Sequence, residues 1–140
     1  MQATRTEVRV RAYGRVALDA VRRYRVAPAD GPREAWKWAV RREFPSKIPS
    51  QEKPCPRVAF LGLCEEGLVK GIPARAYTRG VLNKEYTIAA YVALSKNPAL
   101  CRDRSRLWKL ALAPKEITEN QQLDVLLALW CAKRLKVRPT

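Results

Sequence analysis

Side chains that could do covalent or metal chemistry are few and far apart in this sequence. The 140 residues contain no histidine, which removes the commonest general base near neutral pH and the commonest metal ligand. Cys55, Cys64, Cys101 and Cys131 are separated by 9, 37 and 30 positions, without a CxxC pair. Histidine-based catalytic triads, zincins and His-metal nucleases are therefore excluded. We expect no zinc site and no cofactor.

Cys55 is the one candidate nucleophile. It lies between two prolines, beside Lys53 and Arg57, and close to the start of a predicted helix. Positive charge and a helix N-terminus both lower the pKa of a thiol. Without histidine there is no obvious base to activate it, so an incidental or structural thiol is the favoured interpretation. A small enzyme using Lys53, Cys55 or Tyr77 stays open as an alternative and needs these groups within hydrogen-bond reach.

The carboxylates offer little more chemistry. Glu65 and Glu66 form the one adjacent pair in the sequence. Consecutive residues on a helix point in different directions, so the pair is a poor metal clamp. We expect both side chains to be solvated on a helix surface.

Charge is the strongest feature of the sequence. Lys and Arg number 28 against 13 Asp and Glu, which gives a net charge of +15 and a pI near 10.3. Such an excess raises the local concentration of polyanions, and DNA or RNA is the partner that we expect. An arginine-rich genome that inflates charge over every surface is the competing explanation.

Two irregular, basic stretches are the predicted binding site. The first, residues 45–56, is rich in proline and leads into a helix N-terminus, where free N–H groups favour an anion. The second, residues 70–84, combines glycine, positive charge and a tyrosine suited to base stacking. The predicted nucleic-acid contacts are Lys47, Lys53, Arg57, Lys70, Arg75, Tyr77, Arg79 and Lys84. If the two stretches lie side by side, they form one groove.

Hydrophobic periodicity predicts the helices that must position these loops. Apolar residues recur at helical spacing in residues 6–26, 32–44, 56–66, 84–96 and 98–112, and again from Leu123 to Leu135. Residues 56–66 are apolar almost all round, which indicates a buried central helix. No strand pattern is present. We therefore predict an all-α fold, with residues 1–140 as one compact domain of about six helices and two long irregular loops.

Compartment and membrane association follow from composition. No segment approaches the roughly 20 apolar residues that span a bilayer. The first ten residues lack the apolar stretch of a signal peptide. The few, widely spaced cysteines do not suggest a disulfide framework. We expect a cytoplasmic protein without a membrane partner.

Several runs of the sequence are similar to a known family. They are CPRVAFLGLCEEGLVKGIP from Cys55 to Pro73, NKEY from Asn83 to Tyr86, NQQLDVLLALW from Asn120 to Trp130, and PREAW from Pro32 to Trp36. Together they resemble a family of small bacterial proteins of unknown function over nearly the whole chain. The resemblance implies no activity. It directs attention to polar residues in and around these stretches: Ser50, Gln51, Lys53 and Cys55 before the central helix, Tyr77 and Thr78 after it, and Asn120, Gln121 and Asp124.

A protein-interaction module is the main alternative to nucleic-acid binding. Trp38 falls away from the predicted apolar face of its helix, near Lys37, Arg41 and Arg42. Trp and Arg are enriched at the energetic centres of protein interfaces. The chain would then act as an accessory subunit of a larger bacterial complex, and its oligomeric state stays open.

Overall fold

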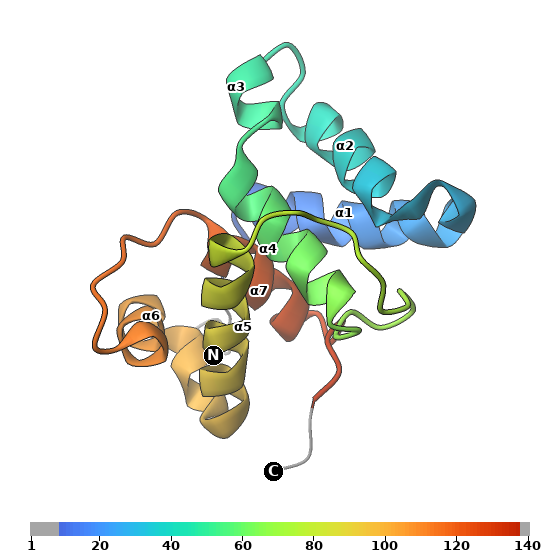
Figure 1. Cartoon of the computed structure of the whole chain (residues 1–140). Coiled ribbons are helices and arrows are strands. Elements are labelled where there is room, and N and C mark those ends of the chain that lie inside the picture. The colour runs from blue at the N-terminus through green and yellow to red at the C-terminus, as the bar shows by residue number, and fades with distance from the viewer. Residues whose placement is uncertain (1–8, 138–140) are drawn as a thin grey trace, which may run out of the picture.

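Helices make up the structure, a computed structural model that describes residues 9–137. In chain order they are α1 (Ala12–Val26), α2 (Gly31–Glu43), α3 (Ile48–Gln51), α4 (Pro54–Glu65), α5 (Leu82–Lys96), α6 (Arg104–Leu112) and α7 (Gln122–Cys131) (Figure 1). Short 3-10 helices precede α2 and α6. Between residues 9 and 137 no strand forms, and Val69 and Leu135 make an isolated bridge. The predicted all-α fold is confirmed, and none of the helices in this range is long and apolar enough to cross a bilayer.

The central helix is α4, as predicted. Residues from Val58 to Cys64 are buried, and the helix packs against α2, α5 and α7. Phe60 stacks on Trp36 of α2, with ring centroids 5.3 Å apart. On the other side of α2, α1 packs along it and also contacts α7. The core therefore lies between α4 and α7 and is closed by α1, α2 and α5.

Several predicted helix boundaries are wrong, and local features explain most of the differences. The first helix begins at Ala12 rather than residue 6, and residues 6–8 lie outside the described range. α4 begins at Pro54 rather than Pro56, since prolines in a first turn lose no hydrogen bond. The 45–56 loop contains the one-turn helix α3. The predicted 98–112 helix is divided at Asp103, whose carboxylate accepts the amide of Arg106 and starts α6.

The last helix also ends earlier than the leucine spacing predicted. α7 stops at Cys131, and Lys133 adopts a left-handed conformation with φ 59°. The amides of Lys133 and Arg134 then bond back to the carbonyls of Trp130 and Leu129, which closes the helix. Beyond this turn the chain runs beside residues 68–70, where Lys136 donates its amide to Leu68 at 2.7 Å. Leu135 is buried, but it belongs to this extended segment and not to a helix.

Candidate nucleic-acid interface

A groove with a volume of about 1010 Å³ lies between α2 and the segment 76–80. Its floor is made by the buried side chains of Val58 and Leu61 on α4 and of Trp36 and Val40 on α2. In Figure 1 the 76–80 segment passes across α4 on its way to α5, on the side of α4 away from α7. Both basic stretches predicted from the sequence therefore border one groove, and α2 supplies a wall that the prediction lacked.

The α2 wall carries three basic side chains at a spacing of four residues. Arg33, Lys37 and Arg41 are exposed and line the groove. Four residues of an α-helix rise about 6 Å, so the three cations form a row along one face. They are absent from the site predicted from the sequence, which centred on the two irregular basic stretches. Their regular spacing in the sequence was the available signal.

Glu65 holds the opposite wall of the groove, the segment 76–80, in place. One carboxylate oxygen accepts the backbone amides of Tyr77 and Thr78, each at 2.8 Å. The other oxygen accepts from the amine of Lys84 at 2.9 Å. The side chain of Glu65 is only 11% exposed, so its expected solvation was wrong, whereas Glu66 is 41% exposed. Burial raises the pKa of Glu65, but the bonds from Lys84, Thr78 and Tyr77 outweigh it, and the net pKa is lowered.

Lys84 serves the fold rather than the groove surface. Its amine bonds both Glu65 and Glu66 at 2.9 Å, and these hydrogen bonds raise its pKa. The stem of the side chain crosses α4 at Gly62, where an added Cβ would lie 2.7 Å from Cγ of Lys84. The charge of Lys84 is thus neutralised by two carboxylates within the structure.

The remaining predicted contacts divide into two groups. Arg57, Tyr77 and Arg79 line the groove, together with Gly80 and Asn83. Lys53 is half-buried where α4 begins, and Lys47 is exposed before α3, but neither lines the groove. Lys70 and Arg75 are exposed outside it, and the amide of Lys70 bonds the carbonyl of Arg134. The structure therefore brings three of the eight predicted residues into the groove.

Basic residues outnumber acidic residues in the lining of the groove. Five basic residues line it, namely Arg33, Lys37, Arg41, Arg57 and Arg79, against the carboxylates of Glu34 and Glu52. None of the five pairs with a carboxylate of residues 9–137 within 4.0 Å. A row of cations without internal partners can neutralise an external polyanion.

A polar cluster lies where α4, α5 and α7 begin. The side-chain amide of Gln122 donates to Asn83 at 2.8 Å and accepts the amide of Asn120 at 2.6 Å. Asn120 in turn reaches the sulfur of Cys55 at 3.5 Å. Tyr77 instead donates its hydroxyl to the carbonyl of Pro73 at 2.6 Å. No hydrogen bond within the described residues joins Lys53, Cys55 and Tyr77, and no cluster of three metal-binding side chains occurs there.

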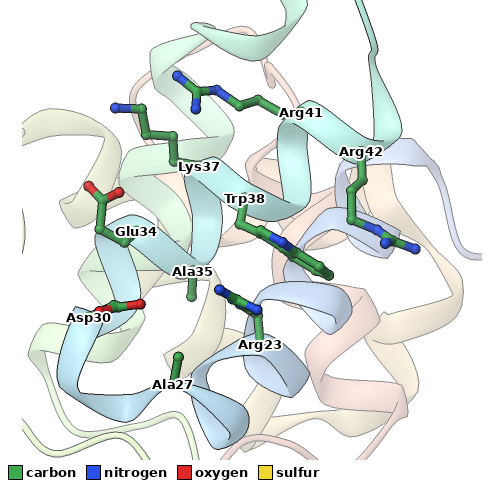
Figure 2. Close-up of a pocket in the computed structure, with 9 residues that line it drawn as sticks. All are labelled: Arg23, Ala27, Asp30, Glu34, Ala35, Lys37, Trp38, Arg41 and Arg42. Carbon is green, nitrogen blue, oxygen red and sulfur yellow. The ribbon is translucent and has the colours of Figure 1, made fainter.

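A second, smaller hollow of about 330 Å³ lies on the other side of α2 (Figure 2). Here Trp38 is half-buried between two guanidinium groups. The central carbon of Arg23 lies 5.0 Å from the ring centroid of Trp38, and that of Arg42 lies 4.7 Å from it. Lys37 and Arg41 border this hollow as well as the groove. Positive charge therefore continues around α2 from one side to the other.

Comparison with known proteins places this chain in a family. Residues 10–136 match the model of a family of unknown function, DUF6979. The chain belongs to this family. The match confirms the resemblance over nearly the whole chain, and the family's description adds no activity, substrate or partner. No curated protein and no solved structure matches the chain.

Proposed function

We propose that this protein of the DUF6979 family binds nucleic acid through phosphate contacts along the groove, without catalysing a reaction. The observation that carries the proposal is the five basic side chains that face the groove without ion-pair partners among residues 9–137. Each phosphate that such a side chain neutralises releases condensed counterions, which drives binding. The net charge of +15 adds long-range attraction for a polyanion.

The walls of the groove are ordered before any ligand arrives. α2 is a regular helix, and Glu65 holds the amides of Tyr77 and Thr78 on the other side. A site whose walls are already fixed loses less conformational entropy when it binds. The free thiols of all four cysteines support a reducing, cytoplasmic setting for this binding.

Salt dependence tests the proposal directly. We expect the binding constant for a fluorescein-labelled 20-mer to fall on the order of 10²-fold between 50 and 200 mM KCl if about five phosphates are neutralised. Lys37→Glu should weaken binding and reduce the salt slope by at least about one. Micromolar or weaker binding that ignores salt would contradict the proposal.

Arg106→Glu is the matched control. It changes the net charge as Lys37→Glu does, and Arg106 is exposed on α6, which does not line the groove. Glutamate at this position also suits the first turn of α6, where Asp103 caps the helix. We expect this variant to keep most of the affinity. Equal losses in the two variants would point to diffuse charge rather than to the groove.

The contacts of Trp38 with the guanidinium groups of Arg23 and Arg42 support a protein-interaction module as the second candidate. Trp38, Arg23 and Arg42 form an ordered aromatic and cationic surface outside the groove. The test is affinity purification of the tagged chain from its native host after nuclease treatment, washed with 1 M salt. A stoichiometric protein partner that Trp38→Ala loses, while Arg79→Glu, a change in the groove alone, retains it, would favour this candidate over nucleic-acid binding.

A further inference from the structure

The shape of the groove indicates which form of nucleic acid enters it. Resting on the proposed function, we propose that the groove binds a single strand of DNA or RNA, with phosphates along α2 and a base stacked on Tyr77. Three observations carry this inference: the groove's size, the placement of charge on both walls, and the fixed position of Tyr77.

Size comes first. The groove volume of about 1010 Å³ is at the upper end of the roughly 300–1,000 Å³ typical of small-molecule sites. Proteins that read a duplex instead present a protruding helix or β-ribbon to a major groove about 12 Å wide. Here Arg57 and Arg79 belong to a concave surface with a buried apolar floor. A duplex would rest on the rims, whereas one strand can enter.

Charge is placed on both sides of the concavity. Arg33, Lys37 and Arg41 lie on α2, Arg79 lies on the facing wall, and Arg57 lies in the first turn of α4 beside the floor. A single strand has its phosphates on one edge and its bases on the other. The row of three cations on α2 can follow successive phosphates, because its members recur every four residues, about 6 Å apart along the helix. The bases then turn toward the wall that carries Tyr77, and Arg57 and Arg79 bind further phosphates as the strand leaves.

Tyr77 is held for stacking by two hydrogen bonds. Its amide donates to Glu65 at 2.8 Å, and its hydroxyl donates to the carbonyl of Pro73 at 2.6 Å. Tyr77 is half-buried, packs against the edge of the core and lines the groove. Trp36 belongs to the floor, but it is only 2% exposed and stacks on Phe60, so it cannot receive a base. Stacking on a tyrosine accepts any base, and we therefore expect weak sequence preference.

The experiment compares strands with a duplex on the full chain. Fluorescence anisotropy would be measured with labelled dT12, labelled rU12 and a labelled 12-base-pair duplex at 100 mM KCl. We expect at least one single strand to bind tenfold or more tightly than the duplex. Tyr77→Ala should weaken strand binding at least about fivefold, whereas Tyr77→Phe, which keeps the ring, should bind nearly as the unaltered protein does.

The outcomes separate this inference from the proposed function. A duplex bound as tightly as the strands, with binding that falls with salt and with Lys37→Glu, would overturn the single-strand inference and leave nucleic-acid binding intact. Absence of salt-dependent binding to all three probes would overturn both. The comparison of probes uses the unaltered protein, so it does not depend on whether the Tyr77 variants fold.

Discussion

The carboxylate of Glu65, at the end of α4, bonds the amine of Lys84 in the first turn of α5 across 2.9 Å. Its second oxygen holds the amides of Tyr77 and Thr78. One side chain thus joins two core helices to the wall of the groove. Because this carboxylate is mostly buried and accepts three hydrogen bonds, the order of that wall depends on it.

Replacing Glu65 by glutamine should destabilise the protein more than the same change at Glu66. The amide of glutamine offers one acceptor oxygen where the carboxylate offers two, and it carries no charge for Lys84. We expect Glu65→Gln to lower the free energy of unfolding by about 1.5–3 kcal/mol. Glu66 is 41% exposed, so Glu66→Gln should cost less than about 1 kcal/mol. Urea unfolding measures both, and equal losses would contradict the role of Glu65.

The contribution of Glu65 should also depend on pH. Its pKa in the folded protein is lowered from the ordinary 4.5 because hydrogen bonds from Lys84 and two amides outweigh its burial. The folded state therefore favours the charged form, and the stabilisation is complete above the ordinary pKa. As the pH falls below 4.5 through the lowered pKa, the stabilisation is lost. Urea unfolding at pH 7, 5, 4 and 3 should show the gap between the unaltered protein and Glu65→Gln closing below pH 4.5; a constant gap would contradict this.

A second buried ion pair fixes the start of α7. Asp124 is 7% exposed and bonds Arg104 of α6, with Glu119 3.6 Å from the same guanidinium nitrogen. Asp124→Ala would leave the partly buried Arg104 with only the more distant Glu119. We expect a loss of about 3 kcal/mol in unfolding free energy. Asp19→Ala, which removes an exposed pair with Arg22 on α1, should cost less than about 1 kcal/mol and serves as the control.

Close contact at Gly80 sets the distance between the 76–80 segment and α4. A Cβ added at Gly80 would lie 2.6 Å from one methyl of Val58 and 2.8 Å from the other. Val58 is buried and stiff at χ1, so Gly80→Ala should destabilise the protein by about 1–3 kcal/mol. Val58→Ala opens space at the same point. The double variant should therefore lose less stability than the two single losses added together, and simple additivity in urea unfolding would show that the contact is unimportant.

Much of the fold could be predicted because helical spacing is a local property of the chain. The apolar stripe of α1, the nearly uniform apolar character of α4 and the leucines of α7 all match buried faces in the structure. Boundaries were less predictable because they depend on single local bonds. Asp103 caps α6 and so divides the helix predicted for residues 98–112. Lys133, in a left-handed conformation, ends α7 before Leu135, although the apolar periodicity continues to that residue.

The candidate site could be predicted only in part. Arg57, Tyr77 and Arg79, which line the groove, were in the predicted site because irregular basic stretches with an aromatic residue are typical of nucleic-acid contacts. Lys84 has the same local sequence character, yet in the structure it neutralises Glu65 and Glu66. No feature of the sequence near Lys84 indicates that it pairs with carboxylates about 20 positions earlier in the chain.

The sequence by itself determined the class of fold, the family and the excess of positive charge, since all three follow from residue types and their local order. Tertiary structure decided which charges face one another. Packing of α2 beside α4 set Arg33, Lys37 and Arg41 opposite Arg57 and Arg79 across a single groove. Helix packing brings together residues far apart in the chain, and a charge's partner depends on distance in space. The groove therefore exists only once the core has formed.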